Sequence, residues 1–152
     1  MNDSKVRVKS KKFKYKTNIK LNDSGEGIIE SKDRNSIKLS APVEFGGIPG
    51  LWTPEDLLVA SVNGCLMTTF LFYTKKRGFK FESYESSAEG IIELVDMQYK
   101  FTEIKIRPKV IVKSKEDIGE AEKLLKISKK SCLISNSLSS KVILEPDIEA
   151  TS

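Results

Sequence analysis

The longest apolar segment of the chain runs from Thr53 to Gly78 and has helix signals at both ends. Thr53 suits an N-cap, Pro54 suits the first helical position, and Gly78 offers a left-handed stop after three cationic residues. Nearly every position between these ends is small or apolar, which is typical of a helix buried on all sides. The pattern predicts a central core helix over 53–78. Its length also fits a membrane span, but internal acidic residues such as Glu55 argue against one.

Polar and apolar positions alternate before this helix, which is typical of strands with one wet face. We expect N-terminal strands within 5–41, beginning with one or two strands over 6–21. The residues Asn22-Asp23-Ser24-Gly25 predict a turn, and we expect short strands to follow it in the chain. The expected elements form an antiparallel meander with strands over 6–21, 27–31 and 36–41.

After Gly78, the alternation predicts two long strands within 79–113, with a bulge near Gly90 and a tight turn at 96–98. Pro108 cannot donate to a strand ladder, so it implies an edge position or a second bulge. The remaining expected elements are a helix over 114–130 capped by Ser114, a short helical segment over 131–138 and a final strand over 141–148 interrupted by Pro146.

The order of elements predicts an α+β fold in which antiparallel sheets wrap around a long central buried helix and a second helix. We expect a single domain over 1–152, because this length suits one hydrophobic core. The predicted sheet is too small to cover a long helix that is apolar on all sides. A second copy of the chain would cover it, so we expect an intimate homodimer.

Composition narrows the class of protein. Hydrophobic residues make up 39% of the 152 residues and charged residues 31%, as in soluble globular proteins. The first ten residues show no apolar signal segment, so we expect a cytoplasmic protein. The net charge of +5 invites a nucleic-acid role, but the cations are mostly lysines interspersed with acids. We interpret them as a solvated surface and expect neither nucleic-acid nor membrane binding.

The chain has no histidine, which excludes several kinds of site. Nucleophiles paired with histidine, histidine-ligated metals and imidazole acid–base chemistry are all removed. Two cysteines alone do not complete a usual zinc site, so we expect no metal and no cofactor. If the protein is an enzyme, its chemistry rests on thiols, carboxylates, lysines or tyrosines.

The two cysteines are the candidate reactive groups. Cys65 lies in the middle of the expected long helix beside Gly64, which we expect to permit close packing. Cys132 follows two lysines at the expected start of a short helix, and both features lower the pKa of a thiol. An alternative interpretation is that both cysteines are simply small buried apolar residues, as most free cysteines are.

Two segments resemble the cysteine motifs of the OsmC/Ohr family, the osmotically inducible and organic hydroperoxide resistance proteins. The stretch from Thr53-Pro54-Glu55-Asp56-Leu57-Leu58 to Gly64-Cys65-Leu66 is similar to the first motif. The stretch from Ser131-Cys132 to Ser137-Leu138 is similar to the second, and Pro42 to Gly47 is similar to the loop before the helix. The resemblance covers nearly the whole chain.

The resemblance implies an intertwined homodimer with active sites at the subunit interface and thiol-dependent reduction of organic hydroperoxides. Cys65 would attack the O–O bond, and Cys132 would resolve the product by forming a disulfide that a dithiol reduces. Glu55 matches a carboxylate that in the family partners a thiolate-activating arginine. Ten helical residues rise ~15 Å, so Glu55 serves the same chain's Cys65 only if the helix breaks, and otherwise serves the other subunit.

The chain departs from the family at that arginine. The matching turn, Asn22 to Gly27, contains none, and neither Arg34 nor Arg7 is an obvious substitute. The second motif also has Leu133 where many relatives carry proline. A non-catalytic dimer of the same fold that binds a small apolar molecule is therefore the alternative. The side chains of Leu66, Phe70 and Phe45 offer an apolar wall for a ligand, although core packing would account for them equally well.

Overall fold

The computed structural model describes residues 11–152, so Arg7 and the start of the first expected strand lie outside the described residues. By internal contacts the chain divides into two compact units, residues 1–53 and 54–152. The boundary falls where the expected long helix begins. That the two units form a single domain stays a prediction, and each unit is described by itself.

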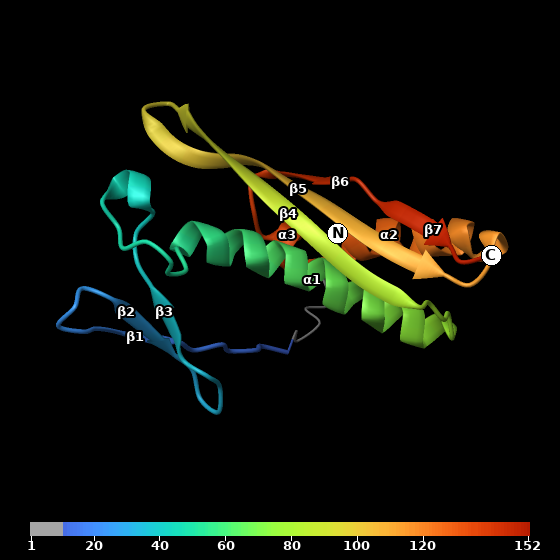
Figure 1. Cartoon of the computed structure of the whole chain (residues 1–152), viewed down its shortest axis with the longest axis horizontal. Helices are drawn as coiled ribbons and strands as arrows, with labels where there is room; N and C mark the ends of the chain where they lie inside the picture. Colours follow the sequence, from blue (N-terminus) through green and yellow to red (C-terminus); the bar gives the residue numbers. More distant parts are fainter. Residues whose placement is uncertain (1–10) are drawn as a thin grey trace, which may run out of the picture. The chain divides into compact units, whose positions relative to one another are not determined.

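The first unit is an antiparallel sheet in the order β1-β2-β3 (Figure 1). Its strands are β1 (Asn18–Leu21), β2 (Gly27–Glu30) and β3 (Ile37–Leu39), followed by the short helix η1 (Val43–Phe45). The Asn22 side chain accepts hydrogen bonds from the backbone N–H groups of Ser24 (3.1 Å) and Glu26 (2.8 Å), which closes the predicted turn. The meander is confirmed, but residues 11–17 form no strand, so the first strand is shorter than expected.

The second unit contains a sheet built on a long hairpin. Strands β4 (Ser83–Val95) and β5 (Gln98–Val112) pair antiparallel, with the predicted bulge as a register shift between Ile91 and Ile92. Strands β6 (Lys141–Leu144) and β7 (Asp147–Ala150) both pair with β5 in parallel. The expected final strand is therefore two strands, separated at Pro146, and the sheet is mixed rather than wholly antiparallel.

The gap between β6 and β7 accounts for Pro108 within the central strand β5. On the side of β5 that faces β6 and β7, the carbonyl groups of Ile106 and Val112 accept hydrogen bonds from the backbone N–H groups of Glu145 and Thr151. Because alternate residues of a strand point to the same side, the missing N–H of Pro108 faces this side as well. It falls between the residues that pair with β6, which end at Ile106, and those that pair with β7, which begin at Lys109. Pro108 thus needs neither an edge strand nor a bulge, contrary to the prediction.

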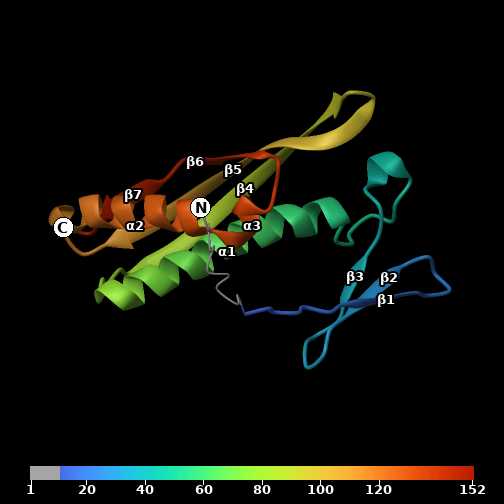
Figure 2. The ribbon, with the colours of Figure 1, turned by 180° about the vertical axis from the view of Figure 1, so that it is seen from behind.

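Two helices cover one face of this sheet (Figures 1 and 2). They are α1 (Pro54–Arg77) and α2 (Ile118–Ser131), and the short α3 (Leu133–Asn136) follows α2. Alternate residues of β5 point into this layer and are fully buried. The core side chains are Val62, Leu66 and Phe70 of α1, Ile104, Ile106, Val110 and Val112 of β5, and Ala121, Leu124 and Leu125 of α2.

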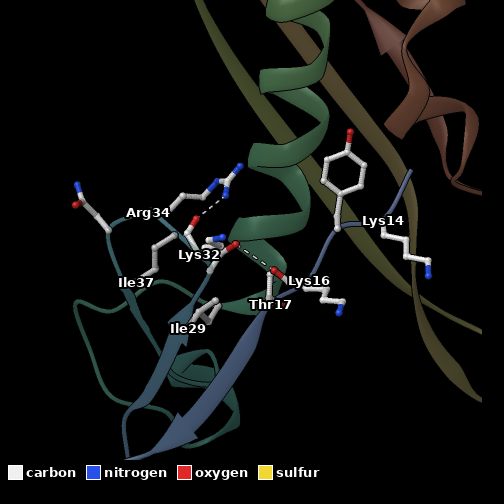
Figure 3. A pocket seen from close by; sticks show the side chains of 10 residues that line it. Lys14, Lys16, Thr17, Ile29, Lys32, Arg34 and Ile37 are labelled. Carbon is white, nitrogen blue, oxygen red and sulfur yellow. Dashed lines mark hydrogen bonds between the residues drawn. The ribbon is translucent and has the colours of Figure 1, made fainter. Parts of the chain in front are cut away.

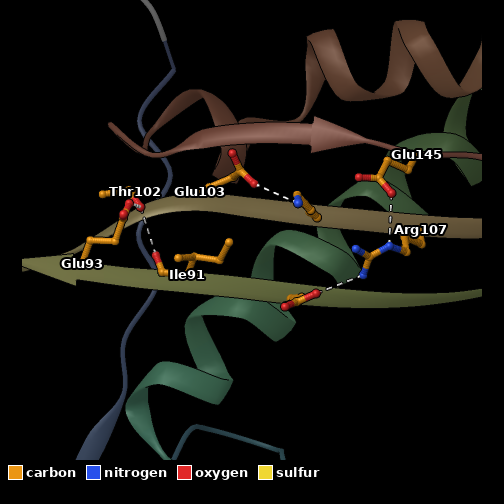
Figure 4. Close-up of polar contacts among 8 residues, drawn as sticks. Ile91, Glu93, Thr102, Glu103, Arg107 and Glu145 are labelled. Atoms are coloured by element: carbon orange, nitrogen blue, oxygen red, sulfur yellow. Dashed lines mark hydrogen bonds and ion pairs between the residues drawn. The ribbon is translucent and has the colours of Figure 1, made fainter.

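On β5, charged residues alternate with the buried ones and lie on the face of the sheet opposite the helices (Figure 4). Arg107 contacts Glu89 of β4 and Glu145 beyond β6, each at 3.2 Å, and Lys105 pairs with Glu103 at 3.3 Å. Such solvated pairs contribute little to stability individually. They show that this face of the sheet is polar, so the apolar core of the unit lies on the helical side alone.

The ends of α1 lie where the sequence predicts, but its burial within one chain is only partial. Helix α1 begins at Pro54 and ends at Arg77, and Gly78 adopts the left-handed conformation at φ 64°. One stripe is buried, while Leu71 is 43% exposed and Phe72 is 59% exposed. Burial on all sides is therefore wrong for the isolated chain. Among the described residues α1 alone is long and apolar enough to cross a membrane, a test that core helices also pass.

The second helix starts later than predicted. Residues Lys115–Asp117 form a 3-10 turn, η2, and α2 begins at Ile118. The Ser114 hydroxyl donates to the Asp117 carboxylate at 3.0 Å, so these side chains bond to each other and not to the backbone N–H groups of the first turn. Helix α2 buries one stripe of side chains, which consists of Ala121, Leu124, Leu125 and Ser128.

Gly90 of β4 provides a test of this packing. A Cβ at this position would lie 2.6 Å from the Phe101 ring and 2.7 Å from Val59 of α1. We expect Gly90→Ala to lower the free energy of unfolding by about 1–3 kcal/mol through overpacking, measured by urea denaturation. Gly119→Ala is the matched control, because a Cβ there meets nothing within 4 Å. Equal stability of both variants would contradict the packing of α1 on β4.

Candidate functional site

The sequence folds so that the two cysteines meet. Cys65 lies midway along α1, and Cys132 occupies the break between α2 and α3. The extended backbone of Cys132 (φ −65°, ψ 112°) ends α2, and the side-chain amide of Asn136 donates to the Lys130 carbonyl at 3.0 Å across the break. This kink places the Cys132 thiol beside α1, where it interacts with the Cys65 thiol and each thiol shifts the pKa of the other. Both thiols are free, without a disulfide between them.

The two thiols have different environments. Burial opposes ionisation of Cys65, but hydrogen bonds from the Cys132 thiol, the backbone of Ile134, the Thr69 hydroxyl and the backbone of Leu133 outweigh it. The pKa of Cys65 is therefore lowered. Cys132 is fully buried. Burial raises the pKa of Cys132, and its hydrogen bond with Cys65 raises that pKa further.

This result corrects the expectation that Cys132 has a lowered pKa. The backbone N–H groups of Leu133 and Ile134 lower the pKa of Cys65, whereas the backbone and hydroxyl of Ser135 lower the pKa of Cys132 by less than burial and Cys65 raise it. Neither Lys129 nor Lys130 contributes to the pKa shift of Cys132. The start of α3 thus acts on both thiols, and only at Cys65 do the donors outweigh the effect of burial on the pKa.

Glu55 does not share this site within one chain. Helix α1 is unbroken from Pro54 to Arg77, and the ten residues between Glu55 and Cys65 rise ~15 Å. One carboxylate oxygen of Glu55, Oε2, is inaccessible to water and has no hydrogen-bond partner within the described part of the chain. Gly64 is also open, because a Cβ there would meet nothing within 4 Å, so the expected close packing at Gly64 is not made within one chain.

The turn that holds the family's arginine is filled by other contacts. The Glu26 carboxylate accepts a hydrogen bond from Asn22 at 2.8 Å and pairs with Lys38 at 3.1 Å. Arg34 lies in the turn at the opposite end of β2, where it donates to the Lys32 carbonyl at 2.9 Å (Figure 3). Arg34 therefore does not occupy the position of the missing arginine. It lines a cationic pocket of the first unit together with Lys14, Lys16 and Lys32.

A small cavity adjoins the thiol pair. It measures about 320 Å³ and is lined by Thr68, Thr69, Phe72, Tyr73 and Ser131. The Tyr73 and Ser131 hydroxyl groups are hydrogen bonded at 2.8 Å, which links α1 to the end of α2. The apolar wall suggested from sequence is different, because Leu66 and Phe70 are fully buried core residues and Phe45 lies in the other unit.

Sequence reasoning missed Thr69 and the backbone donors of Leu133 and Ile134. Thr69 had a usable signal, since a residue four positions after Cys65 lies on the same face of a helix. The backbone donors had none, because no side-chain pattern tells which sulfur an N–H group faces. Among residues 11–152 no group of three or more cysteine or acidic side chains is placed to hold a metal ion.

The order of elements and the paired cysteines match a known family. The sequence pattern of OsmC-like proteins matches residues 46–147. The uncharacterized protein YmaD of Bacillus subtilis (strain 168) is 30% identical over 137 residues, covering 88% of this chain and 90% of YmaD. The chain belongs to the OsmC-like protein family. The predicted resemblance is thereby confirmed, and the matched range includes Glu55, Cys65 and Cys132.

Solved OsmC-like structures have the same fold. An OsmC-like protein of unknown function from Vibrio cholerae superposes with a TM-score of 0.79 at 24% identity, covering 89% of this chain and 99% of that protein. The organic hydroperoxide resistance protein OsmC from Legionella pneumophila gives a TM-score of 0.69 at 21% identity, covering 91% and 99%. The predicted α+β fold of the family is confirmed.

The different environments of the thiols predict different alkylation profiles. The rate of iodoacetamide alkylation rises with pH as a thiol ionises, so the lowered pKa of Cys65 places its midpoint below that of the same cysteine in the urea-unfolded protein. We expect Cys132→Ala to move the Cys65 midpoint upward, because it removes a hydrogen-bond donor to the sulfur. Cys132 in the Cys65→Ser variant should react slowly in the folded protein. A Cys65 midpoint in the native protein at or above that of the unfolded protein would contradict this assignment.

Proposed function

We propose that this OsmC-like protein reduces organic hydroperoxides by a two-cysteine mechanism. The observation that carries the proposal is the interaction between the Cys65 and Cys132 thiols, which belong to elements far apart in sequence. A nucleophile and a resolving thiol must come within bonding distance of each other to form a disulfide. The lowered pKa of Cys65 and the raised pKa of Cys132 support the assignment of the two roles.

In the first step the Cys65 thiolate attacks the terminal oxygen of the hydroperoxide, and the O–O bond breaks. Cys65 becomes a sulfenic acid, and the alkoxide takes up the proton that Cys65 released and leaves as an alcohol. In the second step the Cys132 sulfur attacks the sulfenic sulfur, a disulfide forms, and the hydroxyl group leaves as water with the thiol proton. A dithiol then reduces the disulfide by exchange, becomes a disulfide itself and restores both thiols.

We further propose that the protein acts as a homodimer with its sites at the subunit interface. Support comes from α1, whose face with Met67, Leu71 and Phe72 is exposed in one chain. Glu55 Oε2 is inaccessible yet lacks a hydrogen-bond partner within the described residues, and its distance along α1 excludes the Cys65 of its own chain. In the proposed dimer Glu55 serves the other subunit.

The alternative is a non-catalytic dimer that binds a small apolar ligand. It requires thiols that are too far apart to react or that are closed to reagents. The contact between the two sulfurs disfavours the first condition, and the half-buried state of Cys65 disfavours the second. We therefore propose the peroxidase function ahead of ligand binding. A cytoplasmic location stays a prediction, and the family assignment fits a soluble protein.

A thiol count tests the mechanism directly. We expect one equivalent of cumene hydroperoxide to remove both free thiols of the native protein, with one disulfide formed. In Cys65→Ser the Cys132 thiol should survive, because its pKa is raised and it lacks the activated partner. In Cys132→Ser the sulfenic acid of Cys65 should persist and be trapped by dimedone, detected by mass spectrometry. Survival of both native thiols would overturn the proposed function.

The dimer is tested by hydrodynamics. Analytical ultracentrifugation should give twice the chain mass of 17.0 kDa for the native protein. We expect Leu71→Glu to shift the protein toward the monomer, because it places a charge on the exposed apolar face of α1. Lys123→Glu, an exposed charge change on α2, is the control and should leave the mass unchanged. A native protein of one chain mass at all concentrations would contradict the dimer.

A further inference from the structure

Two adjacent threonines follow Cys65 by one helical turn on α1. The Thr68 hydroxyl donates to the Cys65 carbonyl oxygen at 3.1 Å, and the Thr69 hydroxyl donates to the same oxygen at 2.7 Å. Such bonds to a preceding carbonyl are common for threonine in helices and carry no functional meaning alone. The two residues differ in their surroundings. Thr68 is exposed, whereas Thr69 is half-buried and its hydroxyl also lowers the pKa of the Cys65 thiol.

We propose that Thr69 is a catalytic residue whose hydroxyl turns from the Cys65 carbonyl oxygen to the Cys65 sulfur when the thiol ionises. A hydroxyl has one proton to donate and rotates to the stronger acceptor within reach. The neutral thiol is a weak acceptor, so the proton of Thr69 goes to the carbonyl at 2.7 Å. The thiolate is a charged acceptor, and a hydrogen bond to it is about twice as strong as a neutral one.

The rotation leaves no group unsatisfied. The Cys65 carbonyl lies within the unbroken helix α1, so it keeps the backbone hydrogen bond of the helical ladder. It also keeps the hydroxyl of Thr68. The carbonyl thus loses one of three donors, and the sulfur gains one at the moment when negative charge develops on it. The carbonyl therefore does not depend on the Thr69 hydroxyl for its hydrogen bonding.

The need for such a donor follows from the neighbours of the sulfur. The Cys132 thiol, the backbone N–H groups of Leu133 and Ile134, and the Thr69 hydroxyl are all neutral donors. The turn 22–27 contains no arginine. Within the described contacts, neutral donors alone stabilise the Cys65 thiolate. Thr69 supplies the only side-chain hydroxyl among these donors. Its role in peroxide reduction rests on the proposed function, whereas its effect on the Cys65 thiol does not.

The test is the pH dependence of Cys65 alkylation by iodoacetamide, followed by mass spectrometry of the Cys65 peptide. Thr69→Val keeps the size and branching of the side chain and removes only the hydroxyl. We expect a fall of about tenfold in the alkylation rate at pH 7 and an upward shift of the midpoint, as for loss of a hydrogen bond to a charged group. At high pH, where the thiol is fully ionised, the rate should match the native rate.

Two variants control for structure. Thr69→Ser retains the hydroxyl and should restore the native midpoint, and Thr68→Val should leave it unchanged although it removes a bond to the same carbonyl. If Thr69→Val does not fold, Thr69→Ala serves as the same test. A native midpoint in Thr69→Val, or equal shifts in Thr68→Val and Thr69→Val, would overturn the proposal. Because no hydroperoxide is used, failure of the peroxidase assay would leave this result standing.

Discussion

The contact between Cys65 and Cys132 depends on the packing of α1 against the end of α2, and the proposed chemistry depends on that contact. Helix α1 is held on the sheet by its buried stripe, and α2 is held beside it by Leu124 and Leu125. The break at Cys132 then turns the chain back toward α1. A shift of either helix would separate two sulfurs that have no covalent bond to keep them together. The hydrophobic layer therefore sets the geometry of the site.

The same arrangement divides the two thiols into different roles. Cys65 is half-buried and several hydrogen-bond donors lower its pKa. Cys132 is fully buried, and this burial raises its pKa. The result does not need a nearby cation. It needs N–H groups at a fixed place, and the backbone that begins α3 supplies them. The groups that lower the pKa of Cys65 are backbone and hydroxyl donors and the Cys132 thiol.

The sequence predicts the local features of the fold well. Thr53, Pro54 and Gly78 mark the ends of α1, and the bulge near Gly90 lies one residue from the observed register shift. It does not predict the parallel pairing of β6 and β7, because pairing direction depends on contacts between distant segments. The cysteine motifs identify Cys65 and Cys132. The direction of their pKa shifts requires knowing which sulfur the N–H groups of residues 133 and 134 face, and no sequence pattern encodes this.

The exposed features of α1 have one explanation in common. Leu71 and Phe72 leave apolar surface on a helix that is otherwise in the core, and Gly64 offers an open surface beside Cys65. Glu55 presents a carboxylate oxygen that is closed to water and has no hydrogen-bond partner among residues 11–152, which is costly for a polar group. A second copy of the chain packed on this face would cover the apolar side chains and fill the surface at the glycine. It would also bring donors to Glu55, so the same packing would complete both the core and the site.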